Sequence, residues 1–316
     1  MDKKTVVVAL GGNAILQRGQ RGTLQEQLNN VRGTCEQLAE MVLSGQWKLV
    51  VTHGNGPQVG SILLQQEAAK DSVPPMPMDA CGAQTQGLIG YMIQQSLHHI
   101  LGARGRGDIP LATVVTQVLV DKDDVAFQNP SKPVGPFYSS DEARELSERM
   151  GWDVVEDAGR GWRRVVPSPD PVSIAEKEFI RILVQNRAIV IASGGGGIPV
   201  VQEEGRLKGV EAVIDKDLAG ERLAEDVGAH VLLILTDIPQ VKLNYGKPDE
   251  HALERVTAAE AKQYSEQGHF AKGSMEPKVL AAIRFVQAGG ERAVIASLGQ
   301  ASEALEGQAG TQVVRE

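Results

Sequence analysis

The sequence predicts an α/β fold with a mainly parallel sheet, helices on both of its faces, and a small excursion from the main sheet. Short β-branched runs alternate with longer segments of helical period, as in open α/β sheets. Several runs are apolar throughout, as strands buried on both faces are. The alternation stops between residues 121 and 171, where proline, glycine and aromatic residues concentrate.

Six runs of aliphatic and β-branched residues predict strands. They are Thr5–Leu10, Lys48–Thr52, Leu111–Val120, Ala188–Ala192, Val231–Leu235 and Ala293–Ser297. A sheet built from such runs is buried between two layers of helices.

The segments between these runs have helical period. They predict helices at Leu24–Leu43, Pro57–Ala69, Ala80–Leu101, Ser173–Asn186, Leu218–Val227, Ala258–Gln267 and Pro277–Ala288. Ser173, with Glu176 three residues later, predicts a capping box at the start of its helix.

The segment 121–171 predicts a lid or subdomain with a short helix near Ser140–Met150. It concentrates Lys132, Arg160, Arg163 and Arg164 in an otherwise acidic chain. A long insertion without function is the alternative.

Composition is ordinary for a globular protein of 316 residues, with 42% hydrophobic and 23% charged residues. A net charge of −8 argues against a protein that coats nucleic acid, which needs a basic face. No run approaches the ~18 apolar residues of a membrane span, and the first apolar run stops at Gly11, too early for a signal peptide. We therefore expect a cytoplasmic setting, with Cys35 and Cys81 as reduced, packed thiols.

Three predicted strands end in glycine-rich corners. These are Gly11-Gly12-Asn13, Gly54-Asn55-Gly56 and Gly194–Gly197. The carboxyl ends of parallel strands share one edge of a sheet, and convergent backbone N–H groups there bind anions. Glycine required only for tight turns is the alternative.

Three lysines are candidates to neutralise phosphate charge: Lys132, Lys216 and Lys278. Lys216 lies in an Asp-Lys-Asp triplet that opens a helix, although aspartates there also suit the helix dipole alone. Pro277 is expected at the first helical position, and Lys278 behind it opposes the dipole unless an anion lies nearby.

The sequence offers no obvious pair of nucleophile and general base. For His53 we favour a role in anchoring the backbone or at the edge of the core over a role as general base. Several anion-binding corners with three lysines point to phosphoryl transfer by positioning and charge neutralisation.

Motifs along nearly the whole chain resemble the amino acid kinase family and, within it, its carbamate kinase branch. They include Ala9–Ala14, His53–Gly60, Thr85–Gly87, Asn129–Pro136, Glu156–Arg163, Val165–Pro169, Ser193–Val200, Gly209–Asp217, Asn244–Pro248 and His269–Lys278. The segments around Lys132 and Arg163 are the most specific of these.

The resemblance implies a three-layer α/β/α sandwich, a homodimer, and Mg²⁺ with ATP or ADP. It implies reversible phosphoryl exchange between ATP plus carbamate and ADP plus carbamoyl phosphate. In such enzymes the cellular direction is often ATP synthesis, from carbamoyl phosphate made in arginine, agmatine or purine breakdown.

The resemblance also implies roles for individual residues. Carbamate and the transferring phosphoryl group would be bound by Gly11, Gly12, Asn13, Gly54 and Asn55. Lys132 would reach over that site, and Lys216 and Lys278 would bracket the outer phosphates with Asp217 orienting them. The nucleotide would contact Gly195, Gly196, Asp237 and Tyr245, and no protein side chain is assigned to the metal.

The resemblance places one domain over residues 1–316. Residues 1–186, with the inserted subdomain at 121–171, would form the carbamate half, and residues 187–316 the nucleotide half. Two alternatives stay open: another small-acid kinase of this fold, or a non-catalytic sensor of nucleotide or carbamoyl phosphate. Neither nucleic acid nor a membrane is expected as a partner.

Overall fold

A computed structural model describes residues 3–156 and 161–316. The predicted basic segment around Arg163 is therefore described only from Gly161 onward, and Asp157–Arg160 lie outside the described residues.

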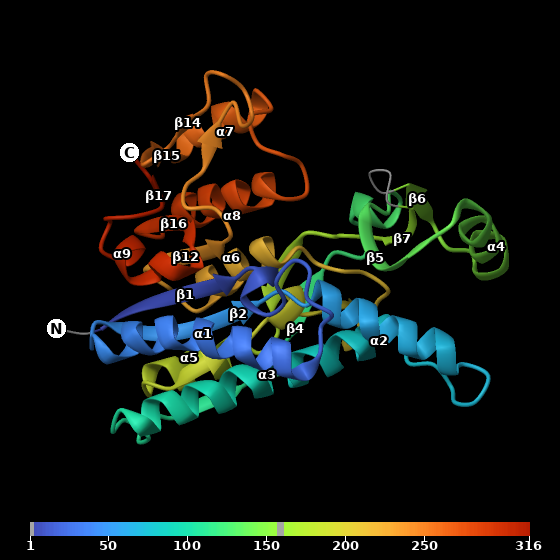
Figure 1. The fold of residues 1–316 in the computed structure, drawn as a ribbon, viewed down its shortest axis with the longest axis horizontal. Coiled ribbons are helices and arrows are strands. Elements are labelled where there is room, and N and C mark those ends of the chain that lie inside the picture. Colours follow the sequence, from blue (N-terminus) through green and yellow to red (C-terminus); the bar gives the residue numbers. More distant parts are fainter. Residues whose placement is uncertain (1–2, 157–160) are drawn as a thin grey trace.

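The centre of the molecule is an eight-stranded sheet with the order β15-β17-β16-β12-β1-β2-β9-β3 (Figure 1). Its strands are β1 (Lys4–Leu10), β2 (Trp47–His53), β3 (Leu111–Thr113), β9 (Ile189–Ile191), β12 (Val231–Thr236), β15 (Arg255–Thr257), β16 (Arg292–Ser297) and β17 (Thr311–Val314). All neighbouring strands pair in parallel except β16 with β17. The mainly parallel sheet is confirmed.

Helices cover both faces of this sheet. One face packs against α1 (Leu24–Leu43), α3 (Met78–Ala103) and α9 (Ala301–Leu305), and the other against α5 (Lys177–Gln185), α6 (Lys216–Asp226), α7 (Ala258–Glu266) and α8 (Met275–Gln287). Side chains alternate along β1. Val6 and Val8 pack in the core between the sheet and α1, α3 and α9, and Val7 and Ala9 pack in the core between the sheet and the other four helices. The fold is the expected three-layer α/β/α sandwich.

A small subdomain projects from this body beyond α2 (Gly56–Ala69), as Figure 1 shows. It consists of β5 (Lys132–Tyr138), α4 (Ser140–Met150), β6 (Val154–Glu156) and β7 (Trp162–Val166). The strands form an antiparallel sheet with β7 in the middle. A capping box between Ser139 and Glu142 starts α4, and Gly151, with a φ of 67°, ends it.

Two smaller sheets complete the fold. One has the order β11-β10-β4-β8, and the other pairs β13 with β14. Their strands are β4 (Gln117–Val120), β8 (Pro171–Ile174), β10 (Ile198–Glu203), β11 (Arg206–Gly209), β13 (Lys242–Leu243) and β14 (His251–Ala252). Short 3₁₀ turns lie at Gly12–Ala14, Val125–Phe127, Gly194–Gly196 and Leu298–Gln300. No helix within the described ranges has the length and apolar character to cross a membrane.

The predicted single strand Leu111–Val120 is wrong, because it is two strands in two different sheets. Gln86 of α3 causes the break. Its side-chain oxygen accepts from the Thr116 N–H at 2.8 Å, and its amide donates to the Thr116 carbonyl at 3.1 Å. A buried side chain thus satisfies the backbone where the chain changes sheets.

The predicted capping box at Ser173 is also wrong. Ser173 lies in β8, and α5 begins only at Lys177. Asp226 keeps this segment extended by accepting from the Ile174 N–H at 2.7 Å and the Ser173 hydroxyl at 3.2 Å. Glu176 instead accepts from the Gln117 N–H at 2.8 Å.

The glycine run Gly194–Gly197 is a point of close packing. Added Cβ atoms would lie 2.4 Å from His53 Nε2 at Gly194, 2.2 Å from Asn55 Nδ2 at Gly195, and 2.4 Å from the Ile214 oxygen at Gly196. At Gly197, which has a φ of +81°, a Cβ would lie 2.1 Å from Val118 Cγ2. Glycine is required here because the chain turns tightly against its neighbours.

We expect Gly197→Ala to destabilise the fold much more than Gly228→Ala. Gly228 also has a positive φ, +66°, but nothing lies within 4 Å of its added Cβ. Gly228→Ala carries backbone strain of about 1 kcal/mol. At Gly197 a ψ of 171° places the residue in a region that is essentially restricted to glycine, where the strain is about 1–3 kcal/mol, and overpacking against buried Val118 adds about 1–3 kcal/mol. Denaturant midpoints of the two variants measure the difference, and equal midpoints would contradict it.

Glu221 of α6 is fully buried, and neither of its carboxyl oxygens has a hydrogen-bond partner in the described part of the chain. Burial raises the pKa of Glu221 to about 7. Arg222 and Arg284 oppose this rise, while Glu225 and Asp170 add to it. The folded protein therefore holds a proton on Glu221 at pH values where an unfolded glutamate has released it.

This raised pKa predicts a loss of stability as pH increases from about 4.5 to 7, because the folded state binds the extra proton. Above pH 7 the cost reaches about 3 kcal/mol. Glu221→Gln should flatten this part of the curve of unfolding free energy against pH, measured by denaturant titration from pH 5 to 8. Glu266→Gln, at an exposed position of α7 that has no part in the raised pKa of Glu221, is the matched control. An unchanged slope in Glu221→Gln would refute the assignment.

Candidate active site

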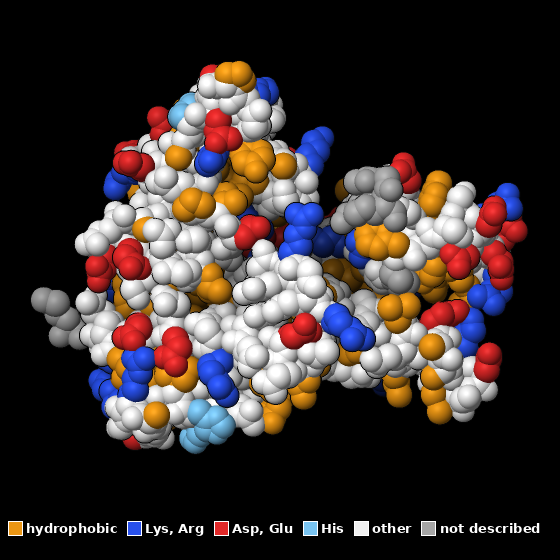
Figure 2. Space-filling model, viewed as in Figure 1, with side chains coloured by type: hydrophobic (Ala, Val, Ile, Leu, Met, Phe, Trp, Pro, Cys, Tyr) orange, Lys and Arg blue, Asp and Glu red, His pale blue; other side chains and the backbone are white. Residues whose placement is uncertain are grey.

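A cavity of about 680 Å³ opens at the carboxyl ends of β1, β12 and β16. It is lined by Gly11, Gly12, Asn13, Ala14, Gln17, Arg18, Lys216, Leu235, Thr236, Asp237, Lys278, Ser297 and Leu298. Figure 2 shows Lys and Arg side chains gathered in the hollow between the main body and the subdomain. Ligands of open α/β sheets bind at this edge.

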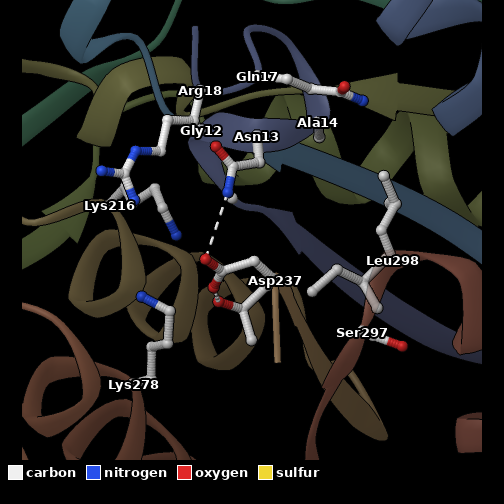
Figure 3. A pocket seen from close by; sticks show the side chains of 13 residues that line it. Gly12, Asn13, Ala14, Gln17, Arg18, Lys216, Asp237, Lys278, Ser297 and Leu298 are labelled. Atoms are coloured by element: carbon white, nitrogen blue, oxygen red, sulfur yellow. Dashed lines mark hydrogen bonds between the residues drawn. The ribbon is translucent and has the colours of Figure 1, made fainter. Parts of the chain in front are cut away.

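The corner after β1 is shaped by the close approach of β12. Gly11 donates its N–H to the Leu235 carbonyl at 2.9 Å, and an added Cβ would lie 2.9 Å from that same oxygen. The chain then makes a 3₁₀ turn that directs Asn13 into the cavity. There Asn13 Nδ2 donates to Asp237 Oδ2 at 3.4 Å (Figure 3).

Lys216 and Lys278 share one buried carboxylate. Lys216 Nζ lies 2.5 Å from Asp217 Oδ1, and Lys278 Nζ lies 3.1 Å from Asp217 Oδ2. Burial alone would raise the pKa of Asp217, but the two ammonium groups outweigh it and leave the pKa below its usual value. Figure 3 shows both lysines reaching into the cavity. Residues 61 positions apart are thus held at one point.

Both lysines lie in the first turn of a helix, Lys216 in α6 and Lys278 in α8. Asp215 is the N-cap of α6, and its side chain accepts from the Asp217 N–H at 2.9 Å. Helix α8 begins at Met275, so the prediction of Pro277 at the first helical position is wrong and Pro277 is the third residue. Lys278 also donates to the Ser274 carbonyl at 3.0 Å, which orients its ammonium group across the helix start.

The corner after β2 lies beside these lysines. The methylene chain of Lys216 passes over Gly54, where an added Cβ would lie 3.0 Å from Lys216 Cδ. Asn55 donates to Thr85 Oγ1 at 2.8 Å and packs against Gly195. These positions lie next to the cavity and not among its lining residues.

His53 is buried, and its Nδ1 lies 3.0 Å from the Gly54 carbonyl oxygen. Burial lowers the pKa of His53 to about 4, so the ring is neutral at pH 7. It does not line the cavity. These observations agree with a structural role for His53 at the edge of the core.

Lys132 is connected to the site through Asp215. It begins β5 of the subdomain, and its Nζ lies 2.7 Å from Asp215 Oδ2. Asp215 therefore joins the subdomain lysine to the first turn of α6, which carries Lys216 and Asp217. Lys132 is half-buried and does not line the cavity itself.

Of the four residues predicted to contact the nucleotide, Asp237 lines the cavity and the other three do not. Asp237 lines the cavity beside Thr236, whose hydroxyl donates to Asp237 Oδ1 at 3.1 Å. Gly195 and Gly196 are buried and lie outside the lining set. Tyr245, between β13 and β14, is 74% exposed and also lies outside it.

Sequence reasoning missed several residues at this site, above all Arg18. Arg18 lines the cavity near Lys216, and no ion pair to it occurs within residues 3–156 and 161–316 (Figure 3). The other missed positions are Gln17, Thr236 and Ser297, and the contact of Asp215 with Lys132 was also not predicted. An arginine shortly after a Gly-Gly-Asn corner was the available signal for Arg18.

Among the described residues, no cluster of three or more His, Cys, Asp or Glu side chains could hold a metal. Of the described residues that line the cavity, Asp237 supplies the sole carboxylate. Lysine, arginine and amide groups dominate the remaining polar lining, which suits an anionic ligand that carries several charges.

Comparison with known proteins agrees with this geometry. The model of the amino acid kinase family matches residues 4–297. Carbamate kinase from Thermococcus kodakarensis is 62% identical over 99% of this chain and 100% of its own length, and that from Pyrococcus furiosus is 57% identical over 98% and 99%. The structure of Giardia lamblia carbamate kinase bound to AMP-PNP superposes with a TM-score of 0.94 at 46% identity over 99% of both chains. The chain therefore belongs to the amino acid kinase family and, within it, to the carbamate kinases, and it is a phosphotransferase.

Proposed function

We propose that this protein transfers a phosphoryl group reversibly between ATP plus carbamate and ADP plus carbamoyl phosphate. The observation that carries the proposal is the pair of ammonium groups, on Lys216 and Lys278, held by buried Asp217 at the rim of one cavity. Names of relatives that cover nearly the whole chain support the choice of substrates.

The proposed reaction is an in-line displacement without a covalent enzyme intermediate. A carbamate oxygen attacks the γ-phosphorus, a new O–P bond forms, and the bond from that phosphorus to the ADP oxygen breaks. The attacking oxygen is already anionic, so no general base is required. Neutral, buried His53 is consistent with this chemistry.

We assign roles to the residues around the migrating group. Lys216 and Lys278 neutralise charge on the phosphoryl oxygens, and Asp217 fixes their positions. Arg18 is an additional candidate, because its side chain faces the same cavity. Carbamate and the phosphoryl group contact the amides and side chains of Gly11, Gly12, Asn13, Gly54 and Asn55, and the nucleotide contacts Gly195, Gly196, Asp237 and Tyr245.

Mg²⁺ fits this site as a partner of the nucleotide. The metal keeps several oxygen ligands from water and phosphate and commonly takes only one or two protein carboxylates. Asp237 is placed to be that carboxylate, because it lies on the cavity wall with its oxygens near Asn13 and Thr236. When bound, Mg²⁺ supplies charge neutralisation on the nucleotide phosphates.

We further propose that ATP synthesis from carbamoyl phosphate, formed in arginine, agmatine or purine breakdown, is the direction used in the cell. The cytoplasm is the compartment expected for such a reaction. The division into a carbamate half, residues 1–186, and a nucleotide half, residues 187–316, also stays a proposal. Strand β9, just past that division, lies between β2 and β3 of the first half.

We also propose a homodimer. The edge strand β3 ends one side of the main sheet, and α3 beside it exposes Leu88 and Tyr91. Tyr91 shares a surface cavity with Leu111 of β3. An unpaired sheet edge next to exposed apolar side chains is typical of a protein–protein contact.

One assay tests the proposed function. ATP formation from ADP and carbamoyl phosphate is followed with and without Mg²⁺, with acetyl phosphate as a parallel donor. ATP from carbamoyl phosphate alone supports the proposal. Equal use of acetyl phosphate would favour another small-acid kinase, and binding without turnover would favour a sensor.

Lys216→Ala and Lys278→Ala should each lower kcat by about 10²–10³-fold, because each removes a charge that acts on the transition state. Circular dichroism should show a folded protein with a lowered thermal midpoint, because removing one ammonium group leaves buried Asp217 with a single cation, so kcat is measured well below that midpoint. Lys262→Ala, at an exposed position of α7, is the matched control and should leave kcat unchanged. A variant at 216 or 278 with near-normal kcat would remove that lysine from the mechanism.

Lys132→Ala should raise KM for carbamoyl phosphate at least about tenfold, while KM for ADP stays nearly constant. Asp215→Asn should act in the same direction, because asparagine keeps the α6 N-cap and loses the charge that holds Lys132. Steady-state kinetics with each substrate varied in turn measure both. A collapse of ADP affinity in Lys132→Ala would show that this lysine serves the nucleotide instead.

A further inference from the structure

A second cavity, of about 240 Å³, lies at the amino-terminal ends of the strands. Its wall includes Lys3, Trp47, Lys48, Arg106, Asn186 and Arg187. Trp47 begins β2, whereas Gly54 of the proposed active site follows its end. The length of β2 therefore separates the two sites by about 20 Å.

The lining of this cavity is strongly basic. It carries four cationic side chains and a single carboxylate, Asp108, which Arg106 contacts at 3.0 Å. Lys3, Lys48 and Arg187 have no ion-pair partner within the described ranges of the chain. Like charges around one small cavity repel each other, and this gathering occurs in a protein of net charge −8.

The backbone at Arg187 is unusual for its residue type. Arg187 follows the end of α5 with a φ of 63°, and its N–H donates to the Val184 carbonyl at 3.0 Å. Glycine takes this left-handed position after α4 and α6, at Gly151 and Gly228. Arginine there costs about 1 kcal/mol of backbone strain.

The helix dipole of α5 accounts for one cation at this helix end. It does not account for Lys3 and Lys48, which come from the residue before β1 and from β2. Arg106 is paired with Asp108, so three segments bring unpaired positive charge to one place. A multiply charged anion is the ligand that removes their mutual repulsion.

We propose that this cavity binds a small oligophosphate anion at a site distinct from the active site. Lys48 and Arg187 supply the principal charges, Asn186 an amide, and Trp47 an apolar wall. The cavity is smaller than the ~300 Å³ at which pockets for drug-sized ligands begin, which favours a compact anion. Such a ligand is an effector or stabiliser, because it lies a strand length from the reacting groups.

Trp47 provides a local test with pyrophosphate as the probe. The chain has three tryptophans, so the full-length Trp152→Phe/Trp162→Phe variant leaves Trp47 as the reporter. Pyrophosphate at constant ionic strength, with NaCl as the balancing salt, should change Trp47 fluorescence along a saturable curve. Sulfate and orthophosphate, which carry fewer charges than pyrophosphate, are titrated in parallel. A linear, non-saturating response equal to that of NaCl would overturn the proposal.

Charge variants identify the residues. Lys48→Glu/Arg187→Glu should weaken pyrophosphate binding at least tenfold in this background. Arg144→Glu/Lys262→Glu makes the same change in total charge at exposed, distant positions and should bind as the parent does. Equal weakening in both pairs would show long-range electrostatics only and would reject the site.

Arg187→Gly separates binding from structure. Glycine relieves the positive φ, so this variant should be at least as thermally stable as the parent without ligand. Its pyrophosphate affinity should still fall at least threefold, and pyrophosphate should raise its thermal midpoint less. Unchanged affinity in Arg187→Gly would mean that Arg187 only ends the helix, and the proposal would fail for it.

Discussion

The buried carboxylate of Asp217 is the interaction on which the geometry of the candidate site depends. Its two oxygens receive the ammonium groups of Lys216 and Lys278, which come from the starts of two different helices. A buried charge costs several kcal/mol unless it is paired, so this carboxylate requires both partners nearby. The cluster of two cations and one anion keeps a net positive charge at the cavity wall. That charge is set in place before any ligand arrives, which is the condition for electrostatic catalysis without reorganisation.

The parallel sheet brings the rest of the site together. Strands β1, β2, β9, β12 and β16 run the same way, so the corners after them meet at one edge. Because these corners are crowded, glycine recurs there for reasons of space as well as of ligand access. Because glycine has no Cβ, Gly11 leaves room for the backbone of β12 and Gly54 leaves room for the Lys216 side chain. Glycine therefore also permits close packing at this edge of the sheet, most clearly at Gly194–Gly197.

The sequence predicted correctly those elements whose ends and faces depend on neighbouring residues. Helix α1 has its predicted bounds, and the structure shows that a capping box of Thr23 and Glu26 starts this amphipathic segment. The lysines at 216 and 278 were recognised from anion chemistry, and the family resemblance implied that Asp217 orients them. The fold adds the contact of each lysine with one oxygen of that carboxylate. The errors came from contacts distant in sequence. Gln86 divides the run 111–120, and Asp226 keeps Ser173 in a strand. Arg18 was missed because a lone arginine in a loop has no periodicity, and its place shortly after the Gly-Gly-Asn corner is the one signal that marks it.

The first turn of α6 joins parts of the molecule that the chain keeps apart. Asp215 and Asp217 are two residues from each other, and their side chains serve different neighbours. Asp215 caps the helix and holds Lys132 of the subdomain, while Asp217 holds the two lysines at the cavity. A displacement of the subdomain that pulls on Lys132 therefore acts on the same helix end that positions Lys216. Because one oxygen of Asp215 stays on the helix backbone, this link can transmit a change in position while the helix remains capped.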